Sequence, residues 1–252
     1  MTFEIENVSK TFVSKDSEEE VVALKDINLT IETGKFVSFV GPSGCGKTTM
    51  LRIIEGFEKP SAGTVKDDGE IVTGPSNERG FIFQNYSLYP WLNVIENVIF
   101  GLNINGKPEK ESRERAMKYL EAVGLKDFAK RYPHELSGGM KQRVAIIRSI
   151  INDSKSLLMD ETFSALDVQT KQKLQKQILE ICKQNNKTII FVTHDIDEAV
   201  FLSDKIVVFS RRPGRIKKIF KVELEHPRNR DDQEFNDLVS EITQEIAELE
   251  DD

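Results

Sequence analysis

Apolar and polar residues alternate in two segments near the amino end of the chain, at 3–12 and 20–32. Such alternation is typical of antiparallel strands that bury one face. Later segments are almost continuously apolar, which indicates more deeply buried strands; they are FVSFV at 36–40, SLLMD at 156–160, TIIFV at 188–192 and KIVVF at 205–209. Segments with helical spacing separate them. We therefore expect an α/β fold with a mostly parallel sheet and an antiparallel β subdomain.

The spacing of apolar residues is mostly helical from 86 to 151, most clearly at 108–124 and 137–151. This stretch predicts a helical subdomain inserted into the α/β core. We expect one domain, 1–252, with three parts: a core at 1–84 and 153–230, the helical subdomain at 85–152, and a carboxyl-terminal helix at 231–252.

The carboxyl-terminal segment has apolar residues at helical spacing with acids between them; these are Phe235, Leu238, Val239, Ile242, Ile246 and Leu249. We expect an amphipathic helix that docks on its own domain. A helix that binds a partner is the alternative.

Composition limits the class of protein. The 252 residues include 42 acidic and 35 basic ones, for a formal net charge of −7, which argues against a general nucleic-acid-binding surface. The two cysteines, Cys45 and Cys182, show neither metal-ligand spacing nor a disulfide pattern. Because the sequence shows neither a signal peptide nor a long apolar run, we expect a soluble intracellular protein.

One local basic run, SRRPGRIKK at Ser210 to Lys218, departs from this acidic balance. It predicts a solvated turn that leads into a strand. A contact with phosphate or lipid is the alternative.

The strand at 36–40 leads directly into GPSGCGKT, Gly41 to Thr48, and then into a helical segment. This is the phosphate-loop pattern in its required context. Its glycines let backbone N–H groups surround phosphate oxygens, Lys47 is expected to reach the β- and γ-phosphates, and the Thr48 hydroxyl is expected to bind Mg²⁺. A simple tight turn is the alternative. The predicted binding residues are Gly41, Pro42, Ser43, Gly44, Cys45, Gly46, Lys47, Thr48 and Thr49.

Two adjacent acids, Asp160 and Glu161, follow the strand at 156–160. In open α/β sheets, ligands bind at the carboxyl ends of strands. A carboxylate there, beside a phosphate loop, can hold Mg²⁺, so we assign this task to Asp160.

A second glycine signal is LSGGMKQR at Leu136 to Arg143. Ser137 can cap the helix that follows, and Gly138 and Gly139 allow close approach to its N–H groups. Alone, this signal is no stronger than that of an ordinary capped helix.

In this order and spacing, GPSGCGKTT, FIFQ, HELSGGMKQR, SLLMDE, SALD and VTHD resemble the nucleotide-binding subunits of ABC transporters. The resemblance covers essentially the whole chain. It implies a P-loop NTPase fold and ATP hydrolysis with ATP and Mg²⁺ as ligands.

The resemblance also implies roles for residues that bind the nucleotide. Gln84 corresponds to the glutamine that senses Mg²⁺ and the γ-phosphate. Phe12 corresponds to the aromatic residue that stacks on adenine, with a strand-core aromatic as the alternative. Ser137, Gly138 and Gly139 correspond to the signature that binds the γ-phosphate of the opposite subunit's ATP.

Four further residues have implied roles around hydrolysis. Glu161 corresponds to the general base that polarises the attacking water, with a local cap or ion pair as the alternative. His194 corresponds to the switch histidine at the γ-phosphate, and it also follows an apolar strand. Ser164 and Asp167 correspond to the loop that crosses the dimer interface. The remaining histidines, His134 and His226, are expected to be structural or surface residues.

The resemblance implies partners as well. One phosphate loop and one signature supply each half-site once, so two copies are expected to dimerise around ATP and to dock on separate permease subunits at the cytoplasmic face of the membrane. The segments YSLYPWLNVIENV, YPHELSGGMKQRVAI and RRPGRI…HPRNRD resemble the importer branch that serves nitrate, sulfonates and taurine, which implies an extracytoplasmic solute-binding protein.

Three alternatives to this function remain. A soluble ABC ATPase that acts on DNA or ribosomes usually has two cassettes or a long coiled coil, and neither is apparent. An importer ATPase of another substrate branch would have the same ATP motifs. A regulatory subunit without turnover would fit loss of Glu161 or His194, and both are present.

The chain departs from the family pattern at several positions. Thr162 follows the predicted base where the family usually has proline, Ser149 and Ile150 stand where the family usually has alanine and leucine, and Ser154 occupies a common proline position. None of these changes removes a group expected to touch ATP. We therefore expect these changes to affect the rigidity of the loops that contain them and not the chemistry of ATP hydrolysis.

Overall fold

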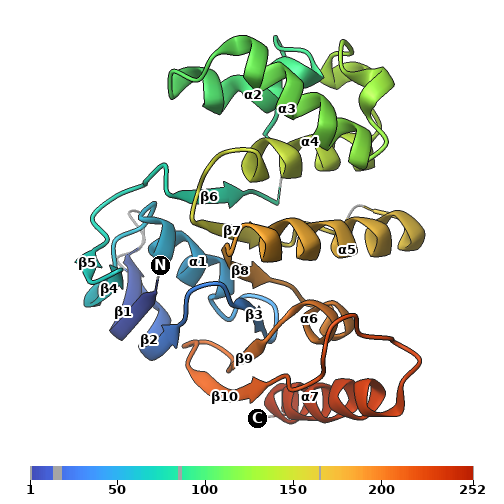
Figure 1. Ribbon diagram of the computed structural model, residues 1–252. Helices are drawn as coiled ribbons and strands as arrows, with labels where there is room; N and C mark the ends of the chain where they lie inside the picture. Colours follow the sequence, from blue (N-terminus) through green and yellow to red (C-terminus); the bar gives the residue numbers. More distant parts are fainter. Residues whose placement is uncertain (1, 14–18, 85–86, 165, 252) are drawn as a thin grey trace. The chain divides into compact units, whose positions relative to one another are not determined.

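The computed structural model describes residues 2–13, 19–84, 87–164 and 166–251. The chain divides into two compact units (Figure 1): the first comprises the residues up to Ser76 and from Asn186 onward, and the second comprises Asn77–Asn185.

The first unit contains an antiparallel sheet with the strand order β2-β1-β4-β5. Its strands are β1 (Phe3–Val13), β2 (Glu20–Ile31), β4 (Ala62–Asp67) and β5 (Glu70–Ile71). The alternation in the sequence corresponds to one buried face, with Phe3, Ile5 and Val8 in the core. The expectation of antiparallel strands at the amino end is confirmed, and β4 and β5 complete the sheet.

A second group of strands in the same unit positions the phosphate loop. Its strands, in spatial order, are β10 (Ile216–Lys221), β9 (Lys205–Phe209), β3 (Phe36–Val40) and β8 (Thr188–Val192). β3 is parallel to β8 and β9, whereas β10 is antiparallel to β9. All residues of β3 and β8 are buried, which explains their continuously apolar sequences. The mixed, mostly parallel sheet agrees with the predicted fold class.

Helices of the first unit pack against these strands and against one another. α1 (Lys47–Glu55) packs on β8, and α6 (Ile196–Leu202) packs on β3. α7 (Gln233–Asp251), coloured red in Figure 1, packs on α6 and buries Phe235, Ile242 and Leu249. The apolar face of the carboxyl-terminal helix is therefore covered, in large part, by its own unit.

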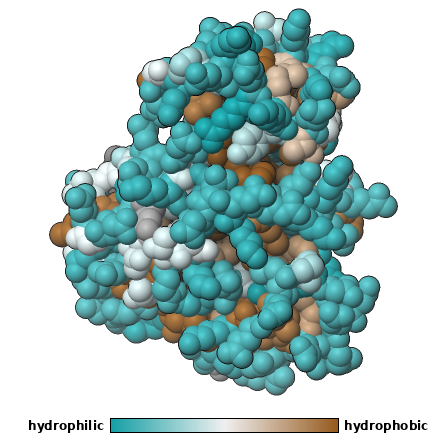
Figure 2. All heavy atoms as spheres, in the orientation of Figure 1, coloured by the Kyte–Doolittle hydropathy of each residue, from teal (hydrophilic) through white to brown (hydrophobic). Residues whose placement is uncertain are grey.

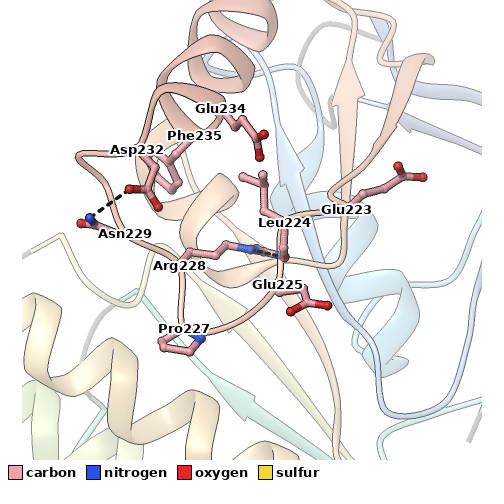
Figure 3. A pocket seen from close by; sticks show the side chains of 9 residues that line it. All are labelled: Glu223, Leu224, Glu225, Pro227, Arg228, Asn229, Asp232, Glu234 and Phe235. Atoms are coloured by element: carbon pink, nitrogen blue, oxygen red, sulfur yellow. Dashed lines mark hydrogen bonds between the residues drawn. The ribbon is translucent and has the colours of Figure 1, made fainter.

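Arg228 fixes the segment that connects β10 to α7 (Figure 3). The residue is 7% exposed, and its guanidinium donates to the carbonyl oxygens of Leu224 at 2.9 Å, Val200 at 2.6 Å and Ser203 at 2.7 Å. Burial lowers the pKa of Arg228 to about 10, and the Asp204 carboxylate opposes this shift, so the side chain remains charged at neutral pH. This residue lines a cavity of about 310 Å³.

The second unit combines a strand pair with a group of helices. β6 (Arg79–Ile82) pairs in parallel with β7 (Ser156–Asp160), and α5 (Val168–Gln184) follows β7. α2 (Val94–Ile104), α3 (Glu109–Ala122) and α4 (Gly138–Ile150) pack together, with short 3-10 turns at Lys126–Phe128 and Pro133–Glu135. These helices lie in the segment predicted to be helical, whose first residues, 85 and 86, lie outside the described residues.

The described surface is predominantly hydrophilic in the face shown in Figure 2. None of the helices in the described part of the chain is both long enough and apolar enough to cross a membrane.

Candidate functional site

The phosphate loop connects β3 to α1 in the first unit, and its glycines have conformations that other residues rarely adopt. Gly41, Gly44 and Gly46 have φ values of 141°, 74° and 106°. A Cβ on Gly41 would lie 2.5 Å from the carbonyl oxygen of Phe209, and one on Gly46 would lie 2.7 Å from the Leu24 side chain. Glycine is therefore required both by backbone conformation and by close packing.

Lys47, the predicted phosphate ligand, folds back over this loop. Its ammonium group, on a residue only 7% exposed, donates to the carbonyl oxygens of Gly41 at 2.7 Å and Pro42 at 2.9 Å, and to Cys45 Sγ at 3.6 Å. The positive charge thus lies within the loop, where phosphate oxygens would replace the carbonyl groups as partners. The preceding Gly46 offers no side chain to cap α1, and the start of a helix without such a cap is suited to an anion.

The predicted switch histidine lies at the same sheet edge as the phosphate loop. Phe39 of β3 is aligned in parallel with Val192 of β8, so the segments that follow both strands emerge at the same edge. His194 is exposed there. The Thr193 hydroxyl holds the adjoining backbone, because it donates to Glu198 at 2.9 Å and accepts from the Asp195 N–H at 3.0 Å.

Phe12, the predicted adenine-stacking residue, lies on β1 and is 40% exposed. The Lys10 ammonium group lies 4.8 Å from the ring centroid. The exposed ring does not belong to the strand core, which was the alternative interpretation, and it is available to a planar ligand.

Two predicted site residues of the second unit contact each other directly. Gln84 lies just after β6, and Glu161 lies just after β7. The Gln84 side-chain amide donates a hydrogen bond to the Glu161 carboxylate at 2.9 Å. Glu161 has a φ of 43°, a left-handed conformation that is unfavourable for a side chain of this size. The Ser164 hydroxyl donates to the Glu161 carbonyl at 3.0 Å and helps to hold it. Asp160 is buried at the end of β7.

The predicted signature residues occupy the start of α4. The Ser137 hydroxyl accepts a hydrogen bond from the Met140 N–H at 3.3 Å and still has its own proton to donate. Gly138 and Gly139 form the first turn of the helix. This arrangement matches a surface that can receive an anion.

Asp167, predicted to lie in an interface loop, caps α5 by accepting from the Thr170 N–H at 3.0 Å. That hydrogen bond lowers the pKa of Asp167, so its carboxylate is charged at neutral pH.

The side chains predicted to bind Mg²⁺ are of the kind that this ion prefers. Thr48 of the first unit has a hydroxyl, and Asp160 and Gln84 of the second unit have a carboxylate and an amide oxygen. Hard cations such as Mg²⁺ prefer oxygen ligands, so the chemistry of each residue fits the ion.

Thr162, where the family usually has proline, is buried in the second unit. Its carbonyl oxygen accepts a hydrogen bond from the Gln142 side chain. Its hydroxyl oxygen has no hydrogen-bond partner among the described residues. Burial of this hydroxyl therefore costs folding free energy, because the hydroxyl loses its bonds to water and gains none in the protein.

We expect Thr162→Val to raise the free energy of unfolding by up to about 1 kcal/mol, because the substitution removes an unpartnered buried hydroxyl at nearly constant volume. Thr193→Val is the matched control, since the buried Thr193 hydroxyl makes the two bonds described above. It should lower the free energy of unfolding by about 1–3 kcal/mol. Urea melts of both variants measure the difference, and a loss above about 1 kcal/mol for Thr162→Val would show that its hydroxyl is bonded.

Sequence reasoning missed one contact with the phosphate loop. Arg212, within the basic run that was expected to be a solvated turn, donates to the carbonyl oxygen of Gly44. The only signal was the run of basic residues itself, which does not specify a target.

Comparisons with known proteins agree with this set of features. The model of the ABC transporter family matches residues 24–164. The nitrate import ATP-binding protein NrtD of Synechocystis sp. is 49% identical over 234 residues, which are 91% of this chain and 87% of that protein. The aliphatic sulfonates import ATP-binding protein SsuB of Bacillus thuringiensis subsp. konkukian is 44% identical over 246 residues, which are 98% and 96% of the two chains.

A solved structure resembles the fold. It is the dimeric, post-hydrolysis state of the ATP-binding cassette MJ0796 bound to ADP and Pi, which aligns with a TM-score of 0.79 at 35% identity and covers 88% of this chain and 100% of that one. With phosphate loop, signature and adjacent acids all present, the chain belongs to the ABC transporter family and is an ATP-binding, ATP-hydrolysing cassette of that family.

Proposed function

We propose that the chain is the ATP-hydrolysing subunit of an ABC importer. Two copies dimerise around two MgATP molecules at the cytoplasmic face of the membrane and drive uptake of a small solute, of the nitrate, sulfonate or taurine kind, through separate permease subunits. An extracytoplasmic solute-binding protein delivers the solute. The observation that carries this proposal is the complete set of ATPase motifs in a chain that is similar over more than nine tenths of its length to NrtD and SsuB.

In the proposed mechanism, the residues around the phosphates bind and orient ATP. Phe12 stacks on the adenine, the backbone N–H groups of the phosphate loop hold the phosphate oxygens, and Lys47 neutralises charge on the β- and γ-phosphates. Thr48, Gln84 and Asp160 would hold Mg²⁺, which would supply positive charge to stabilise the phosphate oxygens.

Glu161 carries out the proton transfer. The oxygen of a water molecule forms a bond to the γ-phosphorus while the bond from that phosphorus to the bridging oxygen of ADP breaks. The Glu161 carboxylate accepts the proton of this water. Its hydrogen bond with the Gln84 amide, at 2.9 Å, orients the carboxylate. His194 contacts the γ-phosphate.

The dimer is proposed because each chain has one phosphate loop and one signature. Ser137, Gly138 and Gly139 of one copy bind the γ-phosphate held by the other copy, through the N–H groups at the start of α4. Ser164 and Asp167 lie at the interface. Each ATP is thereby enclosed only when two copies meet.

An aromatic patch on the second unit supports docking to a permease. Trp91 is 68% exposed, and its ring lies 5.5 Å from that of Tyr89, which in turn lies 4.5 Å from Phe100. The Asn97 side chain holds the backbone of Tyr89 in place, because its amide oxygen accepts from the Tyr89 N–H and its NH₂ group donates to the Tyr89 carbonyl oxygen. An exposed tryptophan that packs on further aromatic rings is characteristic of protein interfaces.

The second candidate, a soluble ATPase acting on DNA or ribosomes, is not favoured. Between Gln84 and Ser137 the α-helices of the described residues are α2 and α3, of 11 and 14 residues, and the other helical segments there are two 3-10 turns of three residues each. They leave no room for a long coiled coil, and the net charge of −7 does not favour nucleic acid.

Reconstitution tests the proposed function. The isolated chain should hydrolyse ATP slowly, and the rate should rise when the chain is bound to its cognate permease in liposomes and solute-loaded binding protein is added. Phosphate release is measured with the permease alone, with empty binding protein and with loaded binding protein. A rate indifferent to all three additions would contradict the importer assignment.

A further inference from the structure

The turn between β9 and β10, residues 210–215, packs directly against the phosphate loop. We call this segment the brace turn. Its Gly214 donates to the carbonyl oxygen of Ala23 at 2.9 Å and accepts from the Lys25 N–H at 2.9 Å, which ties the turn to β2. A Cβ on Gly214 would overlap the carbonyl oxygen of Cys45. The brace turn and the phosphate loop are thus in backbone contact.

Arg212 extends from the brace turn to the centre of the phosphate loop. Its Nη2 and Nε groups donate to the carbonyl oxygen of Gly44 at 3.1 and 3.3 Å. Two N–H groups of one rigid, planar guanidinium therefore converge on a single backbone oxygen. Hydrogen bonds from a charged donor are stronger than those between neutral groups.

This contact determines the direction of a backbone N–H. The Gly44 carbonyl and the Cys45 N–H belong to the same planar trans peptide, so they point in opposite directions. While Arg212 holds the oxygen on its own side, the N–H is directed away from the brace turn, where it now meets the Pro42 carbonyl at 3.4 Å. Gly44, with a φ of 74° and no side chain, would otherwise allow this peptide to rotate easily.

We propose that Arg212 is a positioning residue for nucleotide binding. It holds the Gly44–Cys45 peptide so that the Cys45 N–H faces the phosphate oxygens when nucleotide enters the loop. It acts through the loop backbone. Because the peptide is already ordered before the nucleotide binds, binding does not have to meet the entropic cost of ordering it.

The neighbouring arginines offer a comparison. Arg211 is exposed, and its side chain makes no hydrogen bond or ion pair with any described residue, whereas Arg215 pairs with Asp26 at 3.4 Å. If the brace turn acted only through its positive charge, all three arginines would contribute to nucleotide binding. If it acts through the Gly44 carbonyl, Arg212 alone contributes.

Titration calorimetry with MgADP on the full chain tests this difference, and it needs neither permease nor hydrolysis. We expect Arg212→Ala to raise the Kd about tenfold, the effect of losing one charge-assisted hydrogen bond, and Arg211→Ala to change it less than about twofold. The Kd of Arg212→Lys, which can restore one of the two bonds, should lie between those of the wild-type chain and Arg212→Ala. An unchanged Kd for Arg212→Ala, or an equal loss for Arg211→Ala, would overturn the proposal.

Selective labelling gives a second readout. The chain has two cysteines, so ¹⁵N-cysteine labelling yields two backbone amide signals, from Cys45 in the phosphate loop and from Cys182 in α5. Without nucleotide, Arg212→Ala should shift or broaden the Cys45 signal and leave the Cys182 signal in place, and Arg211→Ala should move neither. A Cys45 signal that does not respond to Arg212→Ala would contradict the positioning role. If Arg212→Ala does not fold, Arg212→Gln gives the same comparison.

Discussion

Glu161→Gln is expected to reduce ATP hydrolysis by roughly 10²- to 10⁴-fold, the usual contribution of a general base. Binding of ATP and Mg²⁺ should persist, because Lys47, Thr48 and Asp160 are unchanged. The amide is nearly isosteric with the carboxylate, so the left-handed backbone at this position, with its φ of 43°, is retained. Uncleaved ATP should then hold two chains together.

Asp160→Asn is the matched control, since it replaces the adjacent acid in the same way. It should weaken Mg²⁺-dependent binding and leave little ATP-stabilised dimer. Gel filtration with MgATP, together with phosphate release, separates the two variants. An active Glu161→Gln enzyme, or the same defect in both variants, would refute the division of tasks between the two acids.

Arg228→Met is expected to lower the free energy of unfolding by about 3 kcal/mol or more. The substitution leaves the carbonyl oxygens of Val200, Ser203 and Leu224 without their shared donor, at a cost of about 1–3 kcal/mol for each group that stays buried. The bonds to Val200 and Ser203 connect the end of α6 to the segment between β10 and α7, and the bond to Leu224 holds that segment together, so the docking of α7 should loosen first.

Arg211→Met is the control for Arg228→Met, because the Arg211 side chain is exposed and makes no hydrogen bond or ion pair with any described residue. It should change the free energy of unfolding by no more than about 0.5 kcal/mol. Urea melts followed by circular dichroism measure both. A loss of less than about 1 kcal/mol for Arg228→Met would show that water replaces the guanidinium at these carbonyl groups.

The parts of the fold that sequence reasoning predicted depend on local patterns. β3, β7 and β8 are nearly continuous apolar runs because they are buried on both faces, and the phosphate loop has its glycines where φ is positive. The order of motifs then supplied the family and with it the expected roles. The apolar strands also place His194 and Glu161 directly after strand ends, as the structure has them, whereas their roles remain predictions.

The parts that sequence reasoning missed depend on contacts between distant residues. Arg212 and Gly44 are 168 positions apart, and nothing in the basic run indicates a carbonyl of the phosphate loop as its partner. Arg228 stands in a polar stretch that is typical of a solvated loop, whereas the structure buries it among carbonyl groups. In contrast, the β4–β5 hairpin had a local signal that went unused: Asp68 and Gly69 both have positive φ, as an Asp-Gly turn predicts.

Uptake into proteoliposomes tests the importer function most directly. The permease is reconstituted with this chain and with ATP enclosed, loaded binding protein is added outside, and the labelled solute inside is measured over time. With the wild-type chain, solute should accumulate against its gradient, and with Glu161→Gln accumulation should stop while the chain remains bound. Accumulation that continues with Glu161→Gln, or hydrolysis by the wild-type complex without any uptake, would contradict the conclusion that ATP hydrolysis by this chain powers import.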